Sequence, residues 1–124
     1  MTSIEQQISD TLISAIKDCN LVQFMYRGSI RKVEPFLIGE LFSIHQTHLE
    51  EGTFALRAWH VSGYSSQPAD KIPGDRWRIY QLKEMADLLI LNETYKKIRP
   101  FYNPDDNAFK RITFRVVVKR NACL

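Results

Sequence analysis

Residues 21–35 read Leu-Val-Gln-Phe-Met-Tyr-Arg-Gly-Ser-Ile-Arg-Lys-Val-Glu-Pro, and they contain the two halves of a β-hairpin. Val22, Phe24 and Tyr26 alternate with polar or flexible residues, which is the period-two pattern of a strand with one buried face. Gly28 can adopt the positive φ that a tight hairpin turn needs. Pro35 has no N–H to donate, so we expect it to end the pairing or to lie at a sheet edge. The pattern therefore predicts two paired strands around a glycine turn.

An amphipathic helix precedes this hairpin. Over residues 3–18, apolar side chains recur at helical spacing and form one stripe, with polar residues on the other face. A single helix of this kind cannot bury its stripe alone, so we expect it to pack on the sheet that the hairpin begins. Two capping-box patterns fit the start of the helix, namely Ser3 with Gln6 and Thr2 with Glu5.

Strand-like patterns continue after the hairpin. They occupy residues 36–46, 54–59, 77–82 and 112–118, and the first is interrupted by Gly39, where we expect a bulge or bend. Together with the helix, these strands predict a single α+β domain over residues 1–124. We expect the N-terminal helix to pack on a strongly bent antiparallel sheet whose short strands curl into a small β-barrel.

Three other segments have weaker patterns. Residues 62–75 are rich in Ser, Gly and Pro, so we expect a long irregular segment that is less protected than the strands on either side. The apolar run at 88–91 fits a strand or a helix equally well. Residues 92–99 have a helix-like pattern that Pro100 ends.

Composition places the chain among ordinary globular proteins. It is 44% hydrophobic and 25% charged, and no apolar run is long enough to cross a bilayer. The first five residues lack the positive start and apolar core of a secretory signal. Cys19 and Cys123 have no metal-ligand spacing between them. We therefore expect a cytoplasmic protein with two reduced thiols, and a disulfide bond between them is the alternative.

The C-terminal part of the chain is strongly basic. From Tyr95 onward it has eight Lys and Arg residues against two Asp residues. Such a balance is compatible with a phosphate-bearing partner, and a solvated basic face is the alternative.

The residues that could support catalysis form weak patterns. His45 and His48, with two glutamates after them, have the spacing of a metal pair, but surface histidines are the simpler interpretation. Asp105 and Asp106 are adjacent in a proline-containing turn, where aspartate commonly binds its own backbone. The chain has no glycine-rich phosphate loop. We therefore expect no enzyme activity, no metal and no cofactor.

Several short motifs occur in a recognisable order. They are Tyr26 and Arg31 around the glycine turn, Val33-Glu34-Pro35, Leu56-Arg57-Ala58-Trp59, Trp77-Arg78-Ile79-Tyr80-Gln81-Leu82 and Phe101-Tyr102-Asn103-Pro104-Asp105-Asp106. In these motifs the sequence resembles the WYL domain family, in particular its small single-domain members, over most of its length. Phe54-Ala55-Leu56 stands where the family has Trp-Tyr-Leu, and Lys83-Glu84-Met85 replaces its Asp-Arg-Ile.

The resemblance implies an SH3-like small β-barrel of the kind found in bacterial regulators and phage-defence proteins. Members of this family sense a negatively charged ligand, a nucleotide or a nucleic-acid end, through a groove lined by arginine and tyrosine. By position, these groove residues fall on Tyr26, Arg31, Arg76 or Arg78, and Tyr80.

The chemistry of the side chains fits this function. Guanidinium groups present planar, permanently charged donors to phosphate, and aromatic rings can stack on bases. We therefore expect a regulatory ligand-sensing module that binds a nucleotide or single-stranded nucleic acid. The expected ligand-binding residues are Tyr26, Arg31, Arg57, Trp59, Arg76, Arg78 and Tyr80.

A protein-interaction barrel that takes no small ligand is the alternative. In that case the protein would be an accessory subunit, and Trp59, Tyr64 and the 62–75 segment would contact a regulator or a defence protein. If the candidate residues bind no anion, the aromatic residues would belong to the core, and the arginines would be solvated or paired with Glu34 and Asp75. Because WYL-like modules often pair and the chain has several candidate edge strands, a homodimer is a further expectation.

Overall fold

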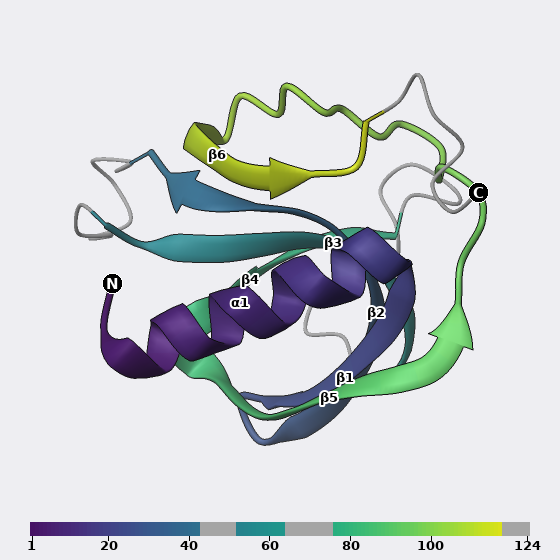
Figure 1. Ribbon diagram of the computed structural model, residues 1–124, viewed down its shortest axis with the longest axis horizontal. Coiled ribbons are helices and arrows are strands. Elements are labelled where there is room, and N and C mark those ends of the chain that lie inside the picture. Colours follow the sequence, from purple (N-terminus) through teal and green to yellow (C-terminus); the bar gives the residue numbers. More distant parts are fainter. Residues whose placement is uncertain (43–51, 64–75, 118–124) are drawn as a thin grey trace.

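The computed structural model describes residues 1–42, 52–63 and 76–117, which form one helix on one face of an antiparallel sheet (Figure 1). The sheet has the strand order β4-β3-β2-β1-β5, and β6 pairs with β2. The elements are α1 (Ser3–Asp18), β1 (Asn20–Tyr26), β2 (Ser29–Leu41), β3 (Phe54–Gly63), β4 (Trp77–Gln81), the short 3-10 helix η1 (Leu82–Glu84), β5 (Met85–Thr94) and β6 (Phe109–Arg115).

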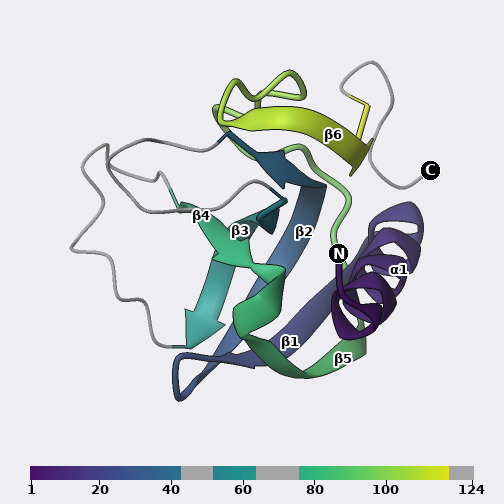
Figure 2. The same cartoon turned by 90° about the vertical axis from the view of Figure 1, so that its left-hand side faces the viewer.

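Helix α1 has the predicted bounds, and the structure selects one of the two caps. The Thr2 hydroxyl accepts the N–H of Glu5, and the Glu5 carboxylate accepts the N–H of Thr2, both at 3.1 Å. The apolar stripe is buried through Leu12, Ala15 and Ile16. Figure 2 shows the helix covering one side of the curved sheet, near β1 and β5.

The predicted hairpin is confirmed as β1 and β2. Val22 lies opposite Val33, and Tyr26 lies opposite Ser29. This register leaves Arg27 and Gly28 as the two turn residues, with φ values of 50° and 81°. Positive φ at both positions is the pattern of a type I′ turn, whose twist matches that of the strands it joins.

The pairing of β2 with β1 ends before Pro35, as predicted, but the strand itself continues through this residue. Pro35 lies in the middle of β2, opposite Ala58 of β3, beside an irregularity in register. On its other side β2 changes neighbour here, because pairing with β1 stops at Val33 and pairing with β6 starts at Leu37. The missing N–H of proline therefore falls where β2 pairs with neither strand, which explains why the strand tolerates it.

The predicted irregularity at Gly39 is confirmed. The pairing of β2 with β6 shifts register between Ile38 and Gly39. A Cβ atom at Gly39 would lie 2.2 Å from the carbonyl oxygen of Arg111. The position thus needs glycine because the backbone of β6 comes so close.

The sheet remains open in the described part of the chain. Strands β4 and β5 stand at the two ends of the strand order, so the sheet is strongly bent without closing on itself (Figure 2). Its core includes the fully buried side chains of Leu12, Phe36 and Leu56. The α+β architecture of the prediction is confirmed in this coarser form.

The secondary structure differs from the prediction in the second half of the chain. Residues 88–91 belong to β5, which continues to Thr94, so the helix predicted over 92–99 is wrong. The last strand, β6, begins and ends earlier than the predicted 112–118. Strand β3 continues to Gly63, and most of the expected irregular segment, 64–75, lies outside the described residues.

Cys19 is disulfide-bonded and buried, so the expectation of a free thiol is wrong at this residue. The second cysteine, Cys123, lies outside the described residues. Helix α1 is too short to cross a membrane, and no helix in the described ranges has the length and apolarity to do so.

Candidate anion-binding site

The pairing of β3 with β4 sorts the candidate residues onto two faces of the sheet. Arg78 lies opposite Ala58, and Tyr80 lies opposite Leu56. Directly opposed residues of an antiparallel pair share a face, so Arg78 and Tyr80 lie on the face that carries these two core residues. Arg57, between Leu56 and Ala58 in the chain, points to the other face.

Five residues, which we call the basic cluster, gather at one end of this sheet: Arg31, His60, Arg76, Arg78 and Tyr80. All except Arg76 are buried, with at most 9% of their surface exposed. Two hydrogen bonds join Arg76 and His60, one between their backbones and one from the Arg76 side chain. The His60 N–H donates to the Arg76 carbonyl at 2.9 Å, and the Arg76 Nε donates to the His60 carbonyl at 2.8 Å. The guanidinium groups of Arg31, Arg76 and Arg78 lie close enough to the His60 imidazole to interact with it electrostatically.

Burial and charge both perturb the titration of this cluster. Burial is the main reason why the pKa of His60 is lowered, and the guanidinium groups of Arg76, Arg78 and Arg31 lower it further. The imidazole is therefore neutral at neutral pH. Burial raises the pKa of Tyr80, while Arg31 and Arg78 oppose that rise.

Nδ1 of His60 and the hydroxyl oxygen of Tyr80 are buried, and within the described part of the chain neither makes a hydrogen bond of good geometry. Weaker polar interactions link His60 to the backbone of Gly63 and Tyr80 to the guanidinium of Arg31. Buried polar atoms are usually paired, because an unpaired one costs about 1–3 kcal/mol. Such atoms beside arginines are chemically suited to contact an anionic group.

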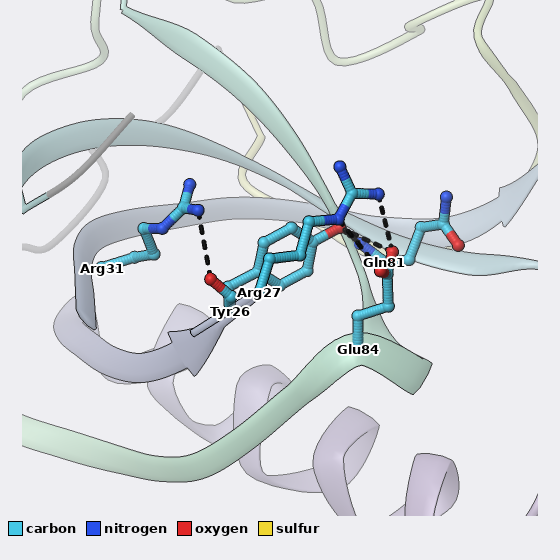
Figure 3. Close-up of polar contacts among 5 residues, drawn as sticks. All are labelled: Tyr26, Arg27, Arg31, Gln81 and Glu84. Carbon is cyan, nitrogen blue, oxygen red and sulfur yellow. Dashed lines mark hydrogen bonds and ion pairs between the residues drawn. The ribbon is translucent and has the colours of Figure 1, made fainter. Parts of the chain in front are cut away.

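Tyr26 adjoins the basic cluster, but its hydroxyl is already engaged. It accepts the Gln81 N–H at 2.9 Å and donates to the Glu84 carboxylate at 3.3 Å. The same carboxylate receives two hydrogen bonds of 2.9 Å from Arg27 (Figure 3). On the opposite side, Arg31 stacks over the Tyr26 ring and donates to its carbonyl at 3.1 Å. Tyr26 therefore positions Arg31 and links β1 to the end of β4.

The Arg27–Glu84 pair predicts a pH-dependent stability. The hydrogen bonds from Arg27 hold the pKa of Glu84 below its usual value of 4.5. Stability from such a carboxylate is present above the unfolded pKa and is lost as pH falls through the folded pKa. We expect Glu84→Gln to lower the free energy of unfolding by about 0.5–1 kcal/mol at neutral pH, because the pair is partly exposed.

Urea denaturation of the wild type and Glu84→Gln checks this result. The difference should shrink as the pH is lowered from about 6 to about 3. Arg27→Gln, which removes the other partner, should show the same pH dependence. A difference that does not change with pH would contradict the assignment.

Arg57 and Trp59 lie apart from the basic cluster. The Arg57 Nε is 2.8 Å from the Asp106 carboxylate, which also accepts the N–H of Ala108. The ring of Trp59 lies 5.4 Å from both the Trp77 ring and the guanidinium of Arg99. The structural interpretation of Asp106 is therefore confirmed. Of the seven predicted binding residues, the structure brings together Tyr26, Arg31, Arg76, Arg78 and Tyr80.

The prediction missed His60. The residue is two positions after Ala58 in β3, so strand alternation places both side chains on the face that carries Tyr80. That alternation was available from the sequence, but the pairing with β4 was not. The other candidate histidines, His45 and His48, lie outside the described residues, as do Tyr64, Lys119 and Arg120.

No protein-family model, curated protein or solved structure matches this chain.

Proposed function

We propose that the protein is a regulatory module that binds an anionic ligand, a nucleotide or single-stranded nucleic acid, at the basic cluster. The observation that carries this proposal is that strand pairing and a hydrogen bond place Arg31, Arg76 and Arg78 near His60, in a largely buried setting. Arginine is well suited to this task because its planar fork binds phosphate bidentately and it remains charged when buried.

The chemistry of the ligand follows from the polar groups of the basic cluster. A phosphate group can accept hydrogen bonds from the guanidinium groups and from the Tyr80 hydroxyl. Neutral His60 can donate one hydrogen bond and accept one. A base attached to that phosphate would extend away from the cluster, so the phosphate supplies most of the expected affinity.

The resemblance to the WYL domain family supports the same proposal. It adds an SH3-like barrel as the finer description of the bent sheet, and a role in bacterial regulation or phage defence. A regulator or a defence protein is the expected partner. A cytoplasmic location remains a prediction, and the disulfide bond of Cys19 is the observation that argues against it.

Fluorescence anisotropy with a labelled single-stranded oligonucleotide tests the proposal. The wild type should bind at low salt and bind more weakly as salt rises, since phosphate contacts release counterions. Arg78→Met keeps an apolar stem but removes the charge. We expect it to weaken binding about ten- to a hundredfold, the effect of losing a charge-assisted hydrogen bond. Arg76→Ala should act in the same direction.

Lys97→Ala is the matched control, because Lys97 is exposed and its loss removes the same charge. It should change the affinity by less than about twofold, since solvated charges are screened. Competition with unlabelled nucleotide and with inorganic phosphate distinguishes a nucleotide site from a nucleic-acid site. If the oligonucleotide and the nucleotide both fail to bind at low salt, or if Lys97→Ala weakens binding as much as Arg78→Met, the proposal is wrong and the interaction-barrel alternative is favoured.

A further inference from the structure

Strand β5 forms one edge of the sheet, and its middle is apolar. In the described part of the chain it pairs with β1 alone. Its residues 88–91 are Leu-Leu-Ile-Leu, with no charge and no proline. Natural proteins often protect an edge strand with a charged residue or a proline, because the unpaired N–H and C=O groups of the edge can pair with another strand.

The exposed side chains of β5 show which part of this edge is unprotected. Leu89 lies opposite Gln23, and Ile90 lies opposite Val22. The side chains of Leu89 and Ile90 therefore point to opposite faces of the sheet. Nevertheless Leu89 is 55% exposed and Ile90 is 43% exposed. Two adjacent apolar residues can both be exposed in this way when the strand itself borders solvent. The unprotected part of the edge is therefore centred on these two residues.

We propose that β5 pairs antiparallel with β5 of a second copy of this chain, so that two sheets join across a two-fold axis. Each copy offers one β5 edge, and antiparallel pairing uses both edges completely. The assembly therefore closes as a dimer.

A second copy is a suitable occupant because the apolar centre of β5 is self-complementary, and the charges at the two ends of β5 determine its register. Directly opposed residues must share a face, so a two-fold axis can pass beside Leu89 or beside Ile90. An axis at Ile90 would bring Asp87 near the partner's Glu93, and like charges facing each other across a strand pair are destabilising. An axis at Leu89 avoids this contact and places Leu88 opposite the partner's Ile90. Parallel stacking in register would align every acidic residue with its own copy, so open-ended assembly is disfavoured.

Two features limit the length of the pairing. Asp87 has a φ of 53°, and the register of β5 against β1 shifts between the Gln23 and Met25 positions. A bulge of this kind twists the edge and ends regular pairing on that side. At the other end, Glu93 forms an ion pair with Lys32 of β2 at 2.6 Å, so this charged pair bounds the apolar part of the strand. The pairing is thus confined to the apolar centre of the strand.

Light scattering coupled to size exclusion tests the proposal across a range of protein concentrations. The wild type should approach twice the 14.5 kDa chain mass as concentration rises. Leu89→Lys places a charge at the two-fold axis, so we expect it to raise the dissociation constant by about tenfold or more. Phe42→Lys is the matched control, because Phe42 is 50% exposed and directly follows β2. The C-terminal end of β2 lies away from β5 (Figure 1). This control should leave the dimer intact.

A cysteine trap tests the register independently of stability. An axis at Leu89 brings its two Cα atoms to about 4.5–5.5 Å, a separation that a disulfide can bridge. Leu89→Cys should therefore give a covalent dimer on a non-reducing gel under mild oxidation, while the wild type and Phe42→Cys should not. A wild type that is monomeric at every concentration overturns the proposal, including the case in which the edge instead binds a segment of another protein. Equal cross-linking of Phe42→Cys, or a dimer that Leu89→Lys leaves intact, also overturns it.

Discussion

Replacing Phe36 with alanine is expected to lower the free energy of unfolding by about 3–5 kcal/mol, the usual cost of removing a buried aromatic ring. Phe36 is fully buried in the centre of β2. Its ring centroid lies 4.8 Å from that of Tyr95 and 5.1 Å from those of Trp77 and Tyr102. These rings come from three separate segments, so the cavity left by the substitution could not be closed by one local movement.

Chemical denaturation of the wild type and Phe36→Ala measures this effect. A domain of this size is typically stable by about 5–15 kcal/mol, so the variant should be markedly less stable at room temperature. Phe42→Ala is the control at an exposed position and should change stability by no more than about 0.5 kcal/mol. Phe36→Leu, which keeps part of the volume, should fall between the two. A loss below about 1 kcal/mol for Phe36→Ala would contradict the proposed packing, because it would mean that the neighbouring rings refill the space.

Arg99→Ala is expected to have the second largest effect, a loss of about 2–4 kcal/mol. Arg99 donates two hydrogen bonds, of 2.6 and 2.7 Å, to the buried carboxylate of Glu34, and its guanidinium stacks on Trp59. Truncation would leave the Glu34 carboxylate buried without its cation. Because Arg99 itself is 38% exposed, we place the cost slightly below the range for a fully buried pair.

Three further variants separate the contributions to this loss. Arg99→Lys keeps the charge but not the planar fork, so it should cost less than alanine. Lys97→Ala removes an exposed charge in the same segment and should have an effect within about 0.5 kcal/mol. Adding Glu34→Leu to Arg99→Ala should restore part of the stability, because it removes the stranded carboxylate. If the double variant is no more stable than Arg99→Ala alone, burial of an unpaired charge is not the cause.

Local patterns were sufficient for the first third of the chain. The helix could be predicted from its stripe and its cap, and the hairpin from alternation around Gly28, since both signals arise from residues close together in sequence. The choice of Thr2 over Ser3 as the cap was not determined in this way. Both patterns are locally valid, and the structure uses the one that starts the helix at Ser3.

The candidate site could be predicted only in part, because its residues come together through pairing of distant strands. The sequence indicated arginines and aromatics suited to an anion, but it could not tell which of them share a face of the sheet. Arg57 and Arg78 have the same chemistry, yet the pairing of β3 with β4 directs them to opposite faces. The partner of Arg57, Asp106, is 49 residues away in the chain.

Short-range patterns were thus enough to predict the fold class, the helix and the hairpin, and they indicated the chemistry of the candidate site. The continuation of β2 through Pro35, and the extension of β5 over residues 92–94 where a helix was predicted, follow from tertiary pairing. The inclusion of His60 in the basic cluster follows from the same pairing. Each of these outcomes depends on which distant strand lies alongside, and long-range pairing overrides local propensity wherever it satisfies the backbone and buries the side chains.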